Sequence, residues 1–399
     1  MGKANPFYLT AILAGTLLLP LVTTGSAFGQ LPPPGQLQQQ QQQQQGRVTI
    51  DGAGATFPFP LIDTWRVEYP TVRPDVSINY QSIGSGGGVK QFTEKTVDFG
   101  ATDAPLTASE MQAAPGAVHI PETIGSVVAA YNINGVQEKG LRLTGPVLAG
   151  IFRGEITRWD DPQIAELNPN LPLPSEDIVV VHRSDGSGTT FVWTSYLSKV
   201  SPEWNQAIGA GKSVSWPVGL GAPGNEGVAN TIQSTPNSIG YVELAYVLTT
   251  EMDYAFLQNQ AGNFVEPSLE STEAAVAAAT NNNTQTSNNS TTGASNTTST
   301  ILPAGDASWE KVSLLDAPGA DSYPIASFSY LLLYKELSDN PRIDSMEKAR
   351  ALVDFVDWAI TDGQQFAGEL AYVPLPDSVV QHDQETLRSL TFQGEPVLQ

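Results

Sequence analysis

The stretch Val181-His182-Arg183-Ser184-Asp185-Gly186-Ser187-Gly188-Thr189-Thr190 joins an apolar segment, residues 178–181, to an amphipathic segment that begins near Thr189. This pattern predicts a strand, a glycine-rich turn and a helix. The first N–H groups of a helix have no internal acceptor, and with the helix dipole they form a site for an anion. Arg183 adds a guanidinium fork and Ser187 a hydroxyl, which suit a tetrahedral oxyanion. An ordinary strand–turn–helix corner has the same elements, so this stretch alone leaves both interpretations open.

Two similar units precede it in the chain. Residues 84–90, GSGGGVK, follow an alternating apolar segment and lead into a short helical stretch. Residues 52–58, GAGATFP, follow the apolar residues 48–50 and precede a helix that we expect to begin at Pro60. Open α/β sheets bind ligands at the carboxyl ends of their strands. Three such units would therefore bring N–H and hydroxyl donors to one place.

Several blocks, in order, make the chain similar to a known family, the phosphate-binding protein of the high-affinity phosphate ABC importer. The similarity runs from about Val48 to about Val380 and is interrupted by one insertion. The blocks are DGAGATFPFP (51–60), YQSIGSGGGVKQF (80–92), VDFGATDAPL (97–106), IFRGEITRWDDPQIAELNP (151–169), RSDGSGTTFVWTSYLSKV (183–200), WPVGLGAPGNEGVA (216–229) and YVPLPDSVV (372–380). The resemblance implies an α/β, two-lobed type II periplasmic-binding-protein fold, with two chain crossings between the lobes and the ligand in the interlobe cleft.

Carried over position by position, the resemblance also implies a set of phosphate ligands. They are Thr56, Phe57, Ser85, Asp103, Arg183, Ser187, Gly188 and Thr189, and Asp185 would hold Arg183 in place. Phe57, Gly188 and Thr189 would act through their backbone N–H groups. Thr56, Ser85 and Ser187 would also contribute hydroxyls.

Asp103 is the unusual member of this set, because a carboxylate repels an anion. Phosphate near neutral pH still carries a proton, so an ionised carboxylate can accept a hydrogen bond from it. Sulfate has no proton to give, and a site built on a required hydrogen bond rejects an analogue that lacks it by roughly 10⁴ to 10⁵. A lone aspartate in a TDAP turn would otherwise be an Asx-turn or a helix cap. The rest of the set favours the ligand role.

The resemblance further implies how the 399 residues are divided. Lobe one would take residues 48–125 plus 326–399 and lobe two residues 126–325, with crossings near 123–127 and 323–327. We expect a helix from about Asp344, capped by that residue together with Glu347, to pack on lobe one.

Within lobe two, an Asn/Ser/Thr-rich insertion at about 276–303 buries nothing and is predicted to be a disordered loop. Its four sequons, at Asn282, Asn288, Asn289 and Asn296, make glycosylation a hypothesis for an exported chain, although an Asn/Thr tract also produces sequons by composition.

The N-terminus is typical of an exported protein. Lys3, the apolar run 7–22 and the small residues 25–27 indicate a signal peptide at 1–29. The apolar run is long for a signal peptide and short for a spanning helix, which needs about 20 residues, so an uncleaved signal anchor remains an alternative. The Pro/Gln-rich residues 30–47 predict a disordered tether. We therefore expect an extracytoplasmic protein in a periplasm-like space or on the outer cell surface, membrane-tethered if the apolar run is retained.

Composition excludes several classes of protein. The chain has no cysteine, which rules out disulfides, thiolate metal sites and cysteine nucleophiles, and its histidines, His119, His182 and His382, lack metal-ligand spacing. We expect no metal and no cofactor. The net charge of −22 disfavours nucleic acid as a partner. It does not exclude a small anion, because salt screens surface charges over about 8 Å and the donors in direct contact with the anion then determine binding. The expected partners are inorganic phosphate and, from the resemblance, the permease subunits with their ATPase; we expect a monomer.

The sequence supports two alternative functions less well than it supports a phosphate receptor. A phosphatase or phosphoryl-transfer enzyme with Ser187 as nucleophile and Asp103 or Asp185 as base would lack the histidine base and carboxylate cluster that such chemistry usually needs. A structural surface protein would not need the intact set of donors. Residues 209–213 lack the first glycine and the strand of a P-loop, and residues 219–224 match GxGxxG with a poorly placed Pro223, after a strand that we expect at 214–218. We predict that the protein is not an enzyme.

Overall fold

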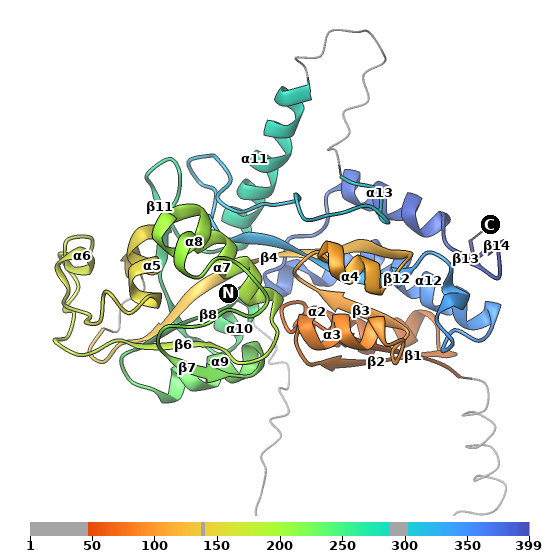
Figure 1. Ribbon diagram of the computed structural model, residues 1–399, viewed down its shortest axis with the longest axis horizontal. Coiled ribbons are helices and arrows are strands. Elements are labelled where there is room, and N and C mark those ends of the chain that lie inside the picture. The colour runs from red at the N-terminus through yellow and green to blue at the C-terminus, as the bar shows by residue number, and fades with distance from the viewer. Residues whose placement is uncertain (1–46, 137–139, 288–301, 399) are drawn as a thin grey trace, which may run out of the picture. The chain divides into compact units, whose positions relative to one another are not determined.

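A single long strand, β4 (Ala117–Asn132), connects the two halves of the fold (Figure 1). From Ala117 to Ser126 it pairs antiparallel with β12 (Ala326–Tyr334), and from Val127 to Asn132 it pairs antiparallel with β8 (Ser238–Glu243). All of its residues except the last are buried, so both of its faces are covered. The strand therefore belongs to two sheets and changes partner between Ser126 and Val127.

The computed structural model describes residues 47–136, 140–287 and 302–398. The predicted signal peptide, all but the last residue of the predicted tether, and the sequons at Asn288, Asn289 and Asn296 lie outside the described residues. Among the described residues, no helix is long and apolar enough to cross a membrane.

The first half is built on strands in the order β2–β1–β3–β12–β4, with β1, β2 and β3 parallel and β12 antiparallel to β3. Helices cover this sheet (Figure 1). The elements are β1 (Val48–Gly54), α2 (Phe59–Val72), β2 (Val76–Ser82), α3 (Ser85–Thr93), β3 (Phe99–Thr102), α4 (Ala108–Ala113), η1 (Leu337–Asp339), α12 (Met346–Ile360), η2 (Asp362–Phe366), η3 (Gly368–Leu370), α13 (Asp377–Arg388), β13 (Thr391–Phe392) and β14 (Glu395–Pro396).

The second half continues the sheet as β4–β8–β6–β7, in which β6 is parallel to both β8 and β7. A separate small sheet has the strand order β11–β10–β5. The elements are β5 (Arg142–Leu143), α5 (Gly145–Phe152), α6 (Pro162–Ala165), β6 (Val179–Arg183), α7 (Gly188–Val200), α8 (Pro202–Ala207), β7 (Leu220–Ala222), α9 (Gly224–Ser234), α10 (Leu244–Thr249), β9 (Asp253–Tyr254), β10 (Phe256–Gln258), β11 (Phe264–Val265) and α11 (Leu269–Ser287). The two-lobed α/β fold predicted from the sequence is confirmed.

The three predicted strand–turn–helix units are present as β1–α2, β2–α3 and β6–α7. The first glycine-rich segment is only partly a turn, because β1 continues through Gly54. A Cβ atom on Gly54 would lie 2.1 Å from the carbonyl oxygen of Ala101, and one on Gly88 would lie 2.4 Å from Cα of Gly54. These glycines therefore let strand β3 and helix α3 approach β1 closely.

Buried aromatic side chains fix the helices to the sheet. Trp65 of α2 is fully buried, and its Nε1 donates a hydrogen bond to the carbonyl oxygen of Gly363 at 2.8 Å. The ring of Tyr69, one turn further on, packs 5.2 Å from that of Phe355 in α12. An aromatic side chain of this kind buries about 200 Å², worth about 5 kcal/mol before the entropy cost of ordering it.

Two details differ from the prediction. Helix α12 is capped by Ser345, whose side chain accepts a hydrogen bond from the N–H of Lys348 at 3.3 Å, and not by Asp344. Helix α11 continues to Ser287, so the first part of the predicted loop at 276–303, including Asn282, is helical. The alanine run before it explains this, because alanine is the best helix former and an established helix extends at little cost.

Candidate anion-binding site

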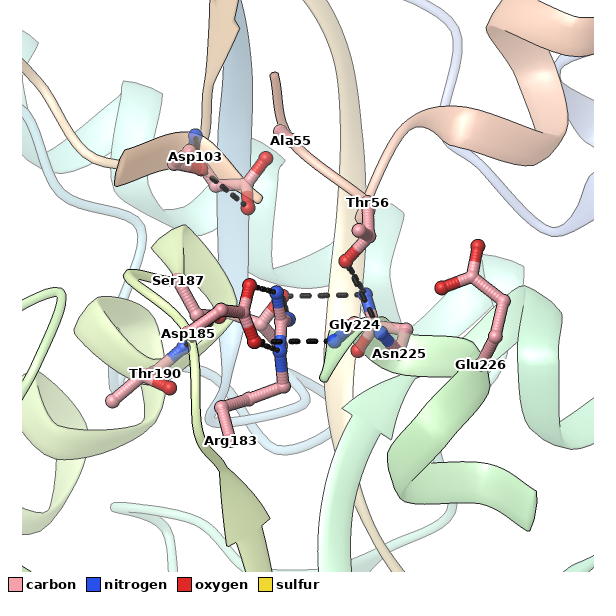
Figure 2. Close-up of polar contacts among 12 residues, drawn as sticks. Ala55, Thr56, Asp103, Arg183, Asp185, Ser187, Thr190, Gly224, Asn225 and Glu226 are labelled. Carbon is pink, nitrogen blue, oxygen red and sulfur yellow. Dashed lines mark hydrogen bonds and ion pairs between the residues drawn. The ribbon is translucent and has the colours of Figure 1, made fainter. Parts of the chain in front are cut away.

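The predicted site residues lie at the carboxyl ends of strands and in the first turns of helices. Each of the eight predicted phosphate ligands is buried, and Asp185 is partly buried. Thr56 and Phe57 follow β1, Ser85 begins α3, Asp103 follows β3, Arg183 ends β6, Ser187 is the N-cap of α7, and Gly188 and Thr189 form its first turn. Figure 2 shows Thr56 and Asp103 approaching from one side and Arg183, Asp185 and Ser187 from the other. The structure thus brings together residues that are up to 133 positions apart, from Thr56 to Thr189.

Asp103 is held by two serines of the first half. Its backbone N–H donates to Oγ of Ser85 at 3.2 Å, and Oγ of Ser329 in β12 donates to its Oδ1 at 2.9 Å. Burial raises the pKa of the Asp103 carboxyl to about 7, against the lowering effects of the Ser329 hydroxyl, the Arg183 charge and the Ser85 hydroxyl. Near neutral pH this group is therefore poised between an acceptor and a donor.

Arg183 is oriented by Asp185 in a bidentate pair. Nε lies 2.8 Å from Oδ1 of Asp185 and Nη2 lies 2.5 Å from Oδ2. Burial opposes ionisation of Asp185, but the hydrogen bonds and charge of Arg183 outweigh it and lower the pKa of this carboxyl. The backbone N–H of Gly224 also donates to Oδ1, at 3.1 Å. The third nitrogen of the guanidinium, Nη1, donates to Oγ1 of Thr189 at 3.4 Å.

The start of helix α7 presents donors to the same place. Oγ of Ser187 accepts from the N–H of Thr190 at 3.0 Å, so its own proton remains available for a ligand. Within the described residues, the N–H groups of Gly188 and Thr189 have no protein acceptor, as expected for the first turn of a helix. A Cβ atom on Gly188 would lie 2.5 Å from both Oδ2 of Asp103 and Oγ of Ser85, so only glycine lets α7 approach them this closely.

Asn225 belongs to the site and was missed by the sequence reasoning. It is fully buried, and its Nδ2 donates to Oγ1 of Thr56 at 3.0 Å and to Oγ1 of Thr189 at 3.3 Å (Figure 2 shows the first). The prediction placed a strand at 214–218, whereas strand β7 lies at 220–222 and α9 begins at Gly224. Correct placement would have revealed a fourth strand–turn–helix unit with Asn225 in the first turn of its helix.

Further contacts join the two halves around the site. The N–H of Gly86 donates to the carbonyl oxygen of Gly186 at 2.7 Å, and Lys212 forms an ion pair with Glu110 of α4. Lys212 is the lysine of the segment that resembles a P-loop. The preceding element is helix α8, whereas a P-loop follows a strand.

The histidines lie elsewhere. His182 stacks on Trp216 with a centroid distance of 4.8 Å, and His119 and His382 each pack against Trp309. Across the part of the chain that the structure describes, no group of three or more His, Cys, Asp or Glu side chains is arranged to hold a metal ion. The site therefore consists of hydroxyls, backbone N–H groups, an amide and a guanidinium that converge on one buried carboxyl.

This two-lobed α/β fold, with hydrogen-bond donors gathered at the carboxyl ends of its strands, is that of the type II binding proteins. A family model described as a PBP superfamily domain matches residues 39–362. The phosphate-binding protein PstS of Xylella fastidiosa (strain 9a5c) is 44% identical over 338 residues, which cover 84% of this chain and 83% of the relative. The phosphate-binding protein PstS of Methanocaldococcus jannaschii is 36% identical over 391 residues, which cover 95% of this chain and 94% of the relative.

Solved structures have the same fold. A putative phosphate ABC transporter substrate-binding protein from Clostridium perfringens, with bound phosphate, has a TM-score of 0.56 and 18% identity over 82% of this chain and all of that one. On the similarity to its relatives, this chain belongs to the PstS family of phosphate-binding proteins.

Proposed function

We propose that this protein is the extracytoplasmic substrate-binding component of a phosphate ABC transporter. It binds inorganic phosphate between its two lobes and delivers it to the membrane permease, which works with an ATPase. The proposed ligands are Thr56, Phe57, Ser85, Asp103, Arg183, Ser187, Gly188 and Thr189, with Asp185 in support. Membership of the PstS family supports the ligand and the role in transport.

One observation carries the proposal: a fully buried carboxyl, Asp103, faces a group of donors that includes Arg183. Donors alone would bind any oxyanion. An ionised Asp103 needs a proton from the ligand, and phosphate has one at neutral pH whereas sulfate has none. A sulfate oxygen would leave a buried acceptor unpaired, which costs about 1–3 kcal/mol, or more for a charged group.

The lobe boundaries of the proposal are residues 48–125 plus 326–399 for lobe one and 126–325 for lobe two. The switch of β4 from β12 to β8 at Ser126 supports the first crossing, and the start of β12 at Ala326 supports the second. Phosphate touching both lobes would shift an open–closed equilibrium toward the closed form, since a ligand stabilises the state in which it makes more contacts.

The protein acts as a receptor and not as an enzyme in this proposal. Ser187, the nucleophile of the alternative, uses its oxygen to accept from the N–H of Thr190, so it serves as a helix cap. The relatives are described as binding proteins, which also supports a receptor. We further propose that it works as a monomer outside the cytoplasm, where the N-terminal segment exports or tethers it.

Calorimetric titration of phosphate-stripped protein tests this function. We expect tight one-to-one phosphate binding in the wild type and a large loss of affinity in Asp103→Ala and in Arg183→Ala. Phosphatase activity toward a generic phosphomonoester should be absent from the same preparation. Failure of the wild type to bind phosphate, or turnover of the phosphomonoester that Ser187→Ala abolishes, would overturn the proposal.

A further inference from the structure

A single hydroxyl lies between two buried carboxyl groups directly behind the site. Oγ of Ser329 in β12 is 2.9 Å from Oδ1 of Asp103 and 2.9 Å from Oε1 of Glu122 in β4. The relative exposure is 1% for Asp103 and 0% for both Glu122 and Ser329. The three side chains thus form a hydrogen-bonded chain that leads from the interior of the protein to the site.

The hydrogen bonds among these three side chains need more protons than two ionised carboxyls and one hydroxyl can supply. A serine hydroxyl has one proton and can donate it to only one acceptor. The other contact needs a proton from the carboxyl itself, because two bare oxygens at 2.9 Å, both buried, would repel each other. One of the two carboxyls is therefore neutral.

The surroundings favour Glu122 as the neutral group. Burial raises the pKa of Asp103, but the charge of Arg183 and the hydroxyl of Ser85 both stabilise its ionised form. Within the described residues, the second oxygen of Glu122, Oε2, has no hydrogen-bond partner, and the charged group that acts on this side chain is the like-charged Asp103. A buried carboxylate without a counter-charge is far more costly than a buried carboxylic acid.

We propose that Glu122 is a positioning residue that stays protonated, donates to Ser329, and so makes Ser329 donate to Asp103, which fixes Asp103 as the ionised acceptor for the ligand's proton. This inference rests on the proposed function, in which Asp103 contacts phosphate. It assigns the specificity of the site to three residues of lobe one, of which two do not touch the ligand.

The groups around Glu122 allow its ionisation to control binding. Tyr80 of β2 is neutral, since burial raises its pKa well above the usual value, and its hydroxyl donates to the carbonyl oxygen of Ala55. Gln364 of η2 donates to the backbone carbonyl of Glu122, and Glu243 at the end of β8 is a further buried carboxyl that interacts with Asp103. None of these groups supplies a positive charge to Glu122.

The hydrogen bonds among Glu122, Ser329 and Asp103 determine how phosphate affinity should change with pH. Burial raises the pKa of Glu122 to about 8, with a raising effect of Asp103 and a lowering effect of the Ser329 hydroxyl. Above that pH, an ionised Glu122 competes for the Ser329 proton and adds a negative charge behind the anion. Phosphate affinity should therefore fall as the pH rises through about 8.

The decisive variant is Glu122→Gln, whose amide is a permanent donor to Ser329 and cannot ionise. Phosphate dissociation constants are measured at pH 7, 8 and 9 for the wild type and this variant. Ionisation of the ligand is common to both and cancels in their ratio. If one ionisation near pH 8 opposes binding, the wild-type constant should rise about tenfold relative to that of the variant between about pH 7 and pH 9, since each pH unit above a pKa changes the neutral fraction about tenfold.

Two further variants separate positioning from packing. Glu122→Leu cannot donate and should bind phosphate at pH 7 more weakly than Glu122→Gln. Asp383→Asn is the matched control, because Asp383 is also fully buried with a raised pKa but burial alone causes the shift. This control should follow the wild-type pH profile. Thermal melting of each protein identifies any variant that fails to fold, and the comparison of Glu122→Gln with the wild type carries the test.

The outcomes distinguish the inference from the function on which it rests. If the wild type binds phosphate and Glu122→Gln has the same pH profile, Glu122 is not a positioning residue and the proposed function stands. If Asp383→Asn flattens the profile as well, the effect is not specific to Glu122 and the inference is wrong. If the wild type binds no phosphate at any pH, the proposed function itself fails.

Discussion

Gly86 and Gly186 meet backbone to backbone, with the N–H of Gly86 donating to the carbonyl oxygen of Gly186 at 2.7 Å. The first residue lies at the start of α3 and the second in the turn before α7. A Cβ atom on Gly86 would lie 2.9 Å from Cα of Gly186. Because neither glycine has a side chain, the turns of the two lobes that carry the hydrogen-bond donors can approach each other.

Gly86→Ala should separate these turns and weaken phosphate binding. The loss of one hydrogen bond, together with displacement of the phosphate-binding residues, should cost about 1.4 kcal/mol of binding free energy, or about tenfold in affinity. The change in stability should be small, because the better helix propensity of alanine in α3, worth about 1 kcal/mol, offsets the lost hydrogen bond. Gly368→Ala is the matched control, since the nearest atom to its Cβ would be 3.9 Å away. Calorimetry and thermal melting check both variants, and unchanged affinity in Gly86→Ala would show that this contact does not govern closure.

Asp185→Asn should weaken phosphate binding by about 10- to 100-fold, because Arg183 loses a charge-assisted bidentate partner worth about 1.5–3 kcal/mol. Arg183→Lys should cost at least as much, since an ammonium cannot reproduce the planar fork. Glu155→Gln is the control: Arg153 and Glu155 form an ion pair at the same spacing, with the Glu155 side chain 55% exposed. An equal loss in the control would mean that surface charge, and not the orientation of Arg183, sets affinity.

Asn225→Asp should also weaken phosphate binding by about 10-fold or more. The substitution keeps the shape of the side chain but removes the donors to Thr56 and Thr189 and adds a negative charge near the anion. Asn168→Asp is a suitable comparison, because Asn168 is 5% exposed and its amide donates to the backbone carbonyls of Arg142 and Ile164. That variant should lose stability while its folded form keeps its affinity. If Asn168→Asp lost affinity while Asn225→Asp kept it, Asn225 would not be a residue of the phosphate site.

The sequence predicts those parts of the site that depend on local chemistry. Glycines and hydroxyls after an apolar strand predicted where Thr56, Ser85, Arg183 and Ser187 would lie, since a strand followed by a helix start is a local pattern. The resemblance predicted the two-lobed fold. Asn225 was missed because strand β7 has only three residues, two of them exposed, and so lacks an apolar pattern.

Long-range packing could not be predicted in the same way. Ser329 and Glu122 lie in β12 and β4, and each looks like an ordinary strand residue in the sequence. Their position behind Asp103 arises only from the pairing of these strands, 207 residues apart. The end of α11 was also misplaced, because the polar tract after its alanine run favours a loop by composition.

Sulfate binding should depend on pH with a definite sign. Burial raises the pKa of Asp103 to about 7, so the neutral form, which can donate to an unprotonated oxygen, increases as the pH falls below that value. Sulfate affinity should therefore be higher at pH 5 than at pH 8, while phosphate binds at both. Competition of sulfate against labelled phosphate at the two pH values checks this. A constant sulfate affinity would show that Asp103 does not set the discrimination.

The most direct test of the central claim, that the Asp103 carboxylate selects an anion carrying a proton, is a sulfate titration of the wild type and Asp103→Asn at pH 8. The asparagine amide can donate to any oxygen, whereas the ionised carboxylate can only accept. We predict no measurable sulfate binding by the wild type, which binds phosphate tightly, and clear sulfate binding by Asp103→Asn. Comparable binding of sulfate and phosphate by the wild type would contradict the account.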